Sequence, residues 1–265
     1  MKNLIAITTY NRPRILDLCL SQIAKCKDDN DVVFVYDDGS LEVKNEIVTF
    51  KNKELNEKIC NDLGFKYVYN FERAKYIKAE LLNETYPENF GIARAKNICL
   101  DFAKKIKATN IILLDDDTFP IKKGFFDYLN KTAETTKENH FILSEHENNP
   151  PVKQFELTRG YKNAEGRLLY ITNKVIDYKI FFDENFGKYG YEHVKWSLEI
   201  FKQKLNTLAV FQQPSNLCDY FTSFDLQDYQ GSLKENNIDF KCSLSVEERQ
   251  NALNISEKIW KKYIK

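Results

Sequence analysis

Four short apolar runs, each suited to a buried strand, punctuate the first 115 residues of the chain. They cover residues 4–8, 32–36, 66–70 and 110–114, and helical spacing recurs between most of them. Strands joined by helical crossovers pair in parallel, because the crossover returns the chain to the same end of the sheet. The pattern predicts an α/β fold with a doubly wound, mostly parallel sheet and helices on both faces.

Helices are expected in both halves of the chain. One begins near Pro13, whose ring suits a first helical turn, a second spans residues 42–62, and a third follows Gly91. In the less regular second half, strands are expected at residues 141–143 and 168–171. Two further helices are expected in this half, over residues 192–204 and from Ser245 towards Tyr263.

Charge and cysteine content exclude several classes of protein. The 39 Lys and Arg residues balance 39 Asp and Glu residues, so no nucleic-acid partner is expected. The six cysteines include no C-x-x-C pair, which is typical of free thiols in a reducing compartment. No run approaches the roughly 20 apolar residues of a membrane span, and the first run is too short for a signal peptide. We expect a cytoplasmic protein; its oligomeric state is not specified.

Three consecutive aspartates, Asp115, Asp116 and Asp117, follow the run at residues 110–114. Clustered carboxylates at the tip of a buried strand repel one another unless a cation is present. Oxygen ligands suit Mg²⁺ or Mn²⁺, which in turn can hold a diphosphate. Open α/β sheets bind their ligands at this end of the strands. A solvated acidic turn is the alternative interpretation of the cluster.

Three other polar segments fall at equivalent ends of the predicted strands. Residues 8–13 read TTYNRP, residues 36–40 read YDDGS and residues 89–97 read NFGIARAKN. Together with LLDDD at residues 113–117, they resemble four motifs of family 2 glycosyltransferases, in the same order and at similar intervals. The family writes these motifs T-x-Y-N-R, D-D-G-S, N-x-G-x-x-x-A-[RK]-N and D-x-D.

The resemblance covers residues 3–205 and implies the GT-A nucleotide-sugar fold. Beyond the resemblance, the chain is expected to end in a small C-terminal helical extension. It divides residues 1–205 into a nucleotide-binding half, up to residue 120, and an acceptor or catalytic half over residues 121–205. Residues 206–265 are expected to pack on this domain. The implied activity is metal-dependent, inverting transfer of a hexosyl or N-acetylhexosaminyl group from a UDP-sugar to a glycan or lipid-linked acceptor. Bacterial surface polysaccharide synthesis is the expected setting.

The resemblance also implies roles for single residues. Asp115 and Asp117 form the D-x-D pair that holds Mn²⁺ or Mg²⁺, with Asp117 as the direct ligand. Asp116 is then expected to face ribose or sugar hydroxyls. Asp38 takes the position that reads uracil, because a carboxylate can accept the imide N–H.

Three residues near the first strand and one basic residue complete the expected donor site. Thr8, Tyr10 and Asn11 are expected to lie against the nucleoside, and Lys96 to reach phosphate or sugar. Each of the last three has an ordinary structural alternative, namely a core position for Tyr10, a helix cap for Asn11 and a solvated helix face for Lys96.

A fifth segment points to the catalytic base. FDENF at residues 182–186 and GYEH at residues 190–193 resemble the family's F-D-E-x-F and G-x-E-D, whose acidic pair provides the base. His193 stands where the family usually has aspartate. The base is therefore Glu192 or His193, since both a desolvated carboxylate and a neutral imidazole can accept a proton. In a third alternative His193 ligates the metal while Glu192 accepts the proton, and in a fourth the pair has only a structural role.

Two other functions are alternatives to a glycosyltransferase. A sugar-1-phosphate nucleotidyltransferase needs a glycine-rich loop after the first strand, and residues 8–13 contain no glycine. A non-catalytic nucleotide-sugar-binding or scaffold protein is favoured only by His193, and the aspartate cluster argues against it.

The expected last helix carries Trp260 and Tyr263 beside several lysines. It either docks on the domain or touches the anionic inner face of a membrane.

Overall fold

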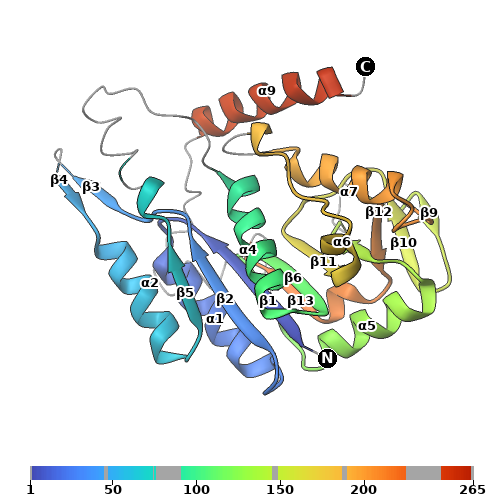
Figure 1. The fold of residues 1–265 in the computed structure, drawn as a ribbon, viewed down its shortest axis with the longest axis horizontal. Coiled ribbons are helices and arrows are strands. Elements are labelled where there is room, and N and C mark those ends of the chain that lie inside the picture. Colours follow the sequence, from blue (N-terminus) through green and yellow to red (C-terminus); the bar gives the residue numbers. More distant parts are fainter. Residues whose placement is uncertain are drawn as a thin grey trace.

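The computed structural model describes residues 2–44, 47–73, 75, 91–144, 149–186, 190–224 and 246–263. Its central sheet has six strands in the order β5-β2-β1-β6-β11-β8 (Figure 1). The first four strands in this order run parallel. Strand β11 pairs antiparallel with β6 and with β8. The strands are β1 (Asn3–Thr9), β2 (Val32–Asp37), β5 (Lys66–Tyr69), β6 (Asn110–Asp115), β8 (His140–Ile142) and β11 (Leu168–Thr172).

Helices cover both faces of this sheet, because its strands are apolar on both sides (Figure 1). Ile5 and Ile7 of β1 enter a core with α1, α2 and α5, whereas Leu4 and Ala6 enter a second core with α4, α6 and α7. The expected doubly wound, mostly parallel α/β fold is confirmed. The helices are α1 (Pro13–Cys26), α2 (Lys51–Asp62), α4 (Ile92–Ile106), α5 (Phe125–Thr136), α6 (Asn173–Asp177), η1 (Glu184–Phe186), α7 (Glu192–Lys202), η2 (Leu217–Asp219) and α9 (Val246–Tyr263).

The helix expected over residues 42–62 is too long. It begins only at Lys51, and the residues before it form an antiparallel hairpin of β3 (Glu42–Lys44) and β4 (Ile47–Thr49). The β-branched residues in this stretch have restricted side-chain rotamers in a helix and fit a strand better. The predicted helix is therefore wrong for the segment before Lys51, where β-branched residues occur instead of the helix-forming residues found in α2.

Residues after Leu205 are not helical throughout. Two small sheets take strands from this part of the chain and pair them with strands of the first 205 residues. One sheet contains β9 (Lys153–Gln154), β10 (Thr158–Tyr161) and β12 (Phe211–Pro214), and the other contains β7 (Thr118–Pro120) and β13 (Phe221–Ser223).

The last helix, α9, lies at the top of Figure 1 and packs against η1. Neither α9 nor any other described helix is long and apolar enough to cross a membrane.

Candidate functional site

A cleft of about 1080 Å³ lies at the carboxyl ends of β1 and β6. The strand register explains the position of its polar groups, because Thr8 of β1 is paired with Asp115 of β6 and with Tyr36 of β2. Adjacent strands thus end at one level, as expected for a binding site in an open α/β sheet. Eight of the predicted site residues line the cleft, namely Thr8, Tyr10, Asp38, Lys96, Asp115, Asp117, Glu192 and His193.

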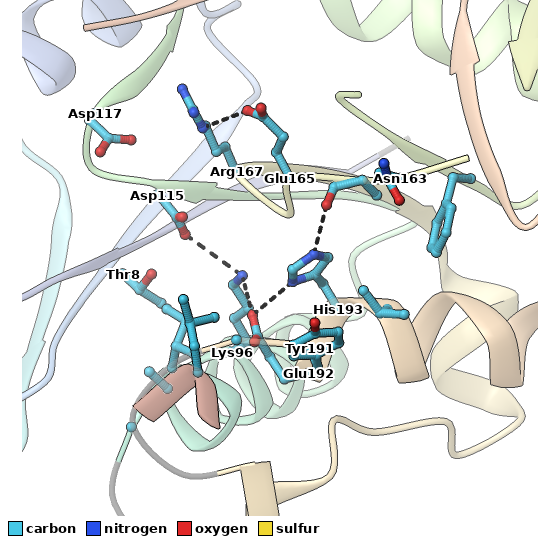
Figure 2. A pocket seen from close by; sticks show the side chains of 18 of the residues that line it. Thr8, Lys96, Asp115, Asp117, Asn163, Glu165, Arg167, Tyr191, Glu192 and His193 are labelled. Carbon is cyan, nitrogen blue, oxygen red and sulfur yellow. Dashed lines mark hydrogen bonds and ion pairs between the residues drawn. The ribbon is translucent and has the colours of Figure 1, made fainter. Parts of the chain in front are cut away.

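Lys96 lies between two carboxylates in the floor of the cleft (Figure 2). Its ammonium nitrogen is 3.7 Å from Oδ1 of Asp115 and 3.4 Å from Oε1 of Glu192, and it donates a hydrogen bond to the carbonyl oxygen of Gly166. The side chain is only 2 % exposed, so a solvated helix face is wrong for this residue. Lys96 joins the end of β6 to the first turn of α7.

Glu192 and His193 form a contact pair at the start of α7 (Figure 2). Nδ1 of His193 lies 3.3 Å from Oε1 of Glu192, and its Nε2 lies 3.0 Å from the carbonyl oxygen of Ala164. Both ring nitrogens face oxygen acceptors, so hydrogen bonding at both sites requires an N–H on each. Burial would raise the pKa of Glu192, but His193 and Lys96 outweigh burial and hold that pKa well below its usual range.

The close approach of His193 to the opposite loop depends on Gly166. This glycine has a φ of +72°, and a Cβ added to it would lie 2.6 Å from Cγ of the imidazole. Any other residue here would have to displace the ring and would adopt a strained backbone.

Asp38 is held by two donors, and sequence reasoning had assigned neither of them to the site. Arg73 forms an ion pair with Oδ2 of Asp38, and Nδ2 of Asn70 donates to Oδ1 at 2.9 Å. The Arg73 guanidinium also lies over the ring of Tyr10, 4.2 Å from its centroid. The only signal for Arg73 in the sequence was a basic residue shortly after the third predicted strand.

Asp116 and Asp117 point to different surroundings. Asp117 lines the cleft, whereas Asp116 is fully buried, accepts a 2.6 Å hydrogen bond from Oγ1 of Thr9 and forms an ion pair with Arg12. Burial raises the pKa of Asp116 to about 7, although Arg12 acts to lower it. The structure therefore places Asp116 beneath the cleft, where it anchors Arg12, and not among the residues that line the cleft.

Asn11 also lies outside the cleft lining. Its backbone is left-handed, with a φ of 56°, and its Oδ1 accepts a 2.7 Å hydrogen bond from the backbone N–H of Leu41. Its own N–H donates to Oγ of Ser40 at 2.8 Å. Asn11 thus ties the loop after β1 to the loop after β2, which positions Tyr10 and Asp38 near each other.

The donor set suits a hard divalent cation. Oδ1 of Asp115 is buried and accepts no hydrogen bond from any residue in the described part of the chain, and Asp117 reaches the cleft close by (Figure 2). Within the same described part, no three His, Cys, Asp or Glu side chains are grouped to hold a metal. Magnesium sites of this kind use one or two carboxylates and complete their coordination with substrate phosphates and water.

Neither a family model nor a curated protein sequence matches this chain. Among solved structures, S. aureus TarS 1-349 is 16% identical, with a TM-score of 0.54 over 97% of this chain and 71% of that chain. Glucosyl-3-phosphoglycerate synthase from Mycobacterium tuberculosis, in complex with Mn²⁺, UDP and glucosyl-3-phosphoglycerate, is 10% identical. Its TM-score is 0.50 over 89% of this chain and 77% of that chain. At these identities the similarity shows the fold, which matches GT-A glycosyltransferase structures.

Proposed function

We propose that this chain is a metal-dependent, inverting glycosyltransferase. It transfers a hexosyl or N-acetylhexosaminyl group from a UDP-sugar to a glycan or lipid-linked acceptor in bacterial surface polysaccharide synthesis. The observation that carries the proposal is one cleft lined by four carboxylates, namely Asp38, Asp115 and Asp117 at strand ends and the buried Glu192 at the start of α7. The M. tuberculosis synthase, which shares the fold, binds UDP and Mn²⁺ and supports the same ligands here.

The nucleoside end of the site is built from Tyr10, Asp38 and Arg73. The Tyr10 ring offers a flat face, and the Asp38 carboxylate offers acceptors for the imide N–H of uracil. Arg73 and Asn70 fix the orientation of that carboxylate before any ligand arrives. Both oxygens of Asp38 already accept from Asn70 and Arg73, and a carboxylate oxygen can accept a second hydrogen bond, here from the imide N–H of uracil.

The leaving diphosphate lies nearest to Asp115 and Asp117 in this proposal. These two residues would hold Mn²⁺ or Mg²⁺, which supplies charge stabilisation for the departing UDP when it is bound. Nη1 of Arg12 lies 3.2 Å from Oδ2 of Asp117 and orients that carboxylate.

Glu192 serves as the base, through Oε2. This oxygen is buried and has no hydrogen-bond partner among the described residues, whereas both nitrogens of His193 face protein oxygens. The acceptor oxygen bonds to the anomeric carbon as the bond to the diphosphate oxygen breaks. The electron pair leaves with UDP, and the hydroxyl proton passes to Glu192. The hydroxyl becomes strongly acidic as it bonds to carbon, so a carboxylate of lowered pKa suffices.

The proposal is tested by thermal unfolding with UDP, GDP and four UDP-hexoses or UDP-N-acetylhexosamines, each with and without Mn²⁺. A ligand that binds only the native state at 100 times its Kd adds about 2.7 kcal/mol to the free energy of unfolding. We expect stabilisation by UDP species that requires Mn²⁺, weaker stabilisation by GDP, and loss of this preference in Asp38→Ala. If no UDP species raises the unfolding temperature in the presence of Mn²⁺, the proposal is contradicted.

A further inference from the structure

The C-terminal helix α9 forms part of the wall of the same cleft. Leu253 and Trp260 of α9 line the cleft together with Tyr191, which directly precedes Glu192. Neither the proposed donor site nor the proposed base explains why α9 lines the cleft.

Three side chains on one face of α9 hold it against the chain that leads into α7. Leu253, Ser256 and Trp260 are spaced at i, i+3 and i+7, which places them in one row along the helix. Ser256 is fully buried, and its hydroxyl donates a 2.9 Å hydrogen bond to the carbonyl oxygen of Phe186. The Trp260 ring stacks with the ring of Tyr191 at a centroid distance of 6.3 Å and an interplanar angle of 20°.

The approach of Leu253 requires a glycine at position 190. Gly190 has a φ of +94°, and a Cβ added there would lie 2.8 Å from Cδ2 of Leu253. The contact therefore depends on a residue without a side chain, beside Tyr191 and Glu192.

Tyr191 itself adopts an uncommon backbone conformation. Its φ of 65° is left-handed, a region that bulky residues rarely occupy unless the surrounding structure holds them there. Such conformations concentrate at functional sites. Here the conformation occurs at the residue next to Glu192, and the ring lies in the cleft on Trp260.

We propose that Tyr191 and Trp260 form the platform on which a pyranose ring of the acceptor packs. The inference rests on the proposed function and narrows the acceptor to a glycan that presents a sugar ring. One face of a pyranose consists of C–H groups that pack on aromatic rings, while its rim of hydroxyls needs polar partners. The loop across the cleft supplies Lys162, Asn163 and Glu165 as such partners. Tyr191 and Glu192 line the same cleft, so a sugar packed on Tyr191 lies on the side of the cleft that holds the proposed base.

The chain contains two tryptophans, which makes the platform directly observable. Trp196 is 1% exposed in the core, so a fluorescence change on addition of a small ligand reports mainly on Trp260. The full chain, with UDP and Mn²⁺ present, is titrated with the methyl glycosides of glucose, galactose, mannose, N-acetylglucosamine and N-acetylgalactosamine. We expect a saturable change for at least one of them.

Variants are compared by ligand-observed saturation-transfer NMR with the same glycosides. Trp260→Phe keeps an aromatic face and should retain binding, whereas Trp260→Leu keeps apolar bulk alone and should weaken binding at least tenfold. Tyr191→Leu tests the second ring in the same way. Ile255, 56% exposed on α9, provides the matched control, and Ile255→Ala should bind like the parent.

The outcomes separate this inference from the proposed function. If UDP and Mn²⁺ bind but no glycoside does, or if Trp260→Leu binds glycosides like the parent, the platform is wrong and the donor assignment stands. If glycosides bind through Trp260 but UDP species do not bind, the platform stands and the proposed function fails. Trp260→Leu and Tyr191→Leu test the two rings independently, so a variant that unfolds does not remove the test.

Discussion

The ammonium group of Lys96 lies 3.4 Å from Oε1 of Glu192, and both side chains are almost completely buried. The same ammonium lies 3.7 Å from Asp115, so one cation offsets charge on the strand that carries the aspartates and on the helix that carries the proposed base. Burying one of these charged groups without a group of opposite charge beside it is strongly unfavourable for folding.

Replacing Lys96 by Met should therefore destabilise the fold, because it leaves the buried Glu192 and the partly exposed Asp115 without their shared cation. Loss of one partner from a buried pair typically costs about 3–5 kcal/mol. Urea unfolding measures the effect. The double variant Lys96→Met with Glu192→Gln should lose less than the sum of the two single variants, because the neutral amide no longer needs the cation. A loss below about 1 kcal/mol in Lys96→Met would show that Lys96 is not the essential counter-charge.

The two neighbouring aspartates should respond differently to replacement by alanine. Asp117→Ala should abolish the Mn²⁺-dependent part of UDP binding and should lower stability less than Asp116→Ala, because Arg12 keeps Asp116 as its partner. Asp116→Ala should instead lower stability by about 2–4 kcal/mol, because Arg12 and Thr9 lose a buried partner. Calorimetric titration with UDP, with and without Mn²⁺, and urea unfolding provide the two readouts. Metal-dependent binding that survives in Asp117→Ala would overturn the assignment of the metal ligand.

The extent to which the sequence predicts this site depends on how local each feature is. The positions of Asp115 and Asp38 in the site could be predicted, because both residues follow strand ends and parallel strands present their carboxyl termini together. The surroundings of Lys96 involve Gly166 and Glu192, 70 and 96 residues further along the chain, and no local pattern encodes such contacts. Arg73 was missed for the same reason, because its importance comes from Asp38 and Tyr10 on other loops.

The fold shows the same division between local and tertiary signals. Most strands and helices with sustained apolar periodicity were predicted, but the helix α5 was missed. The hairpin before α2 was missed because its strands are only three residues long. Asp116 could not be separated from its neighbours by sequence, since the burial that distinguishes it arises from Thr9 and Arg12.

Stability should decrease on mild acidification because His140 is buried as a neutral imidazole. Its Nδ1 lies 3.0 Å from the carbonyl oxygen of Tyr170 and its Nε2 lies 2.9 Å from Oγ of Ser197, and burial lowers its pKa from 6.5 to about 4. The unfolded chain binds a proton near pH 6.5 and the native state near pH 4. Stability contributed by His140 is therefore complete above pH 6.5 and is lost as the pH falls towards 4, by up to about 3 kcal/mol.

Urea unfolding of the parent and of His140→Gln between pH 7.5 and 4.5 measures this contribution. Carboxylates titrate in both proteins, so the difference between the two curves isolates the histidine. Parallel curves would show that His140 does not carry this pH dependence.

Glu192→Gln and His193→Asn distinguish the three catalytic interpretations of their pair. If Oε2 of Glu192 accepts the proton, Glu192→Gln should bind UDP and Mn²⁺ within about twofold of the parent but lose at least about 100-fold in activity. Activity is measured as UDP release from the UDP-sugar that stabilises the protein most. His193→Asn should retain most activity, because the imidazole only orients the carboxylate through Nδ1.

The opposite pattern would identify His193 as the base, and loss of Mn²⁺-dependent UDP binding in His193→Asn would make it a metal ligand. Normal activity in both variants would place the base elsewhere. The contacts of His193 argue against His193 as the base, because a ring that donates from Nε2 to the carbonyl oxygen of Ala164 can accept a proton only at Nδ1. That nitrogen faces Oε1 of Glu192, 3.3 Å away, and not the open part of the cleft.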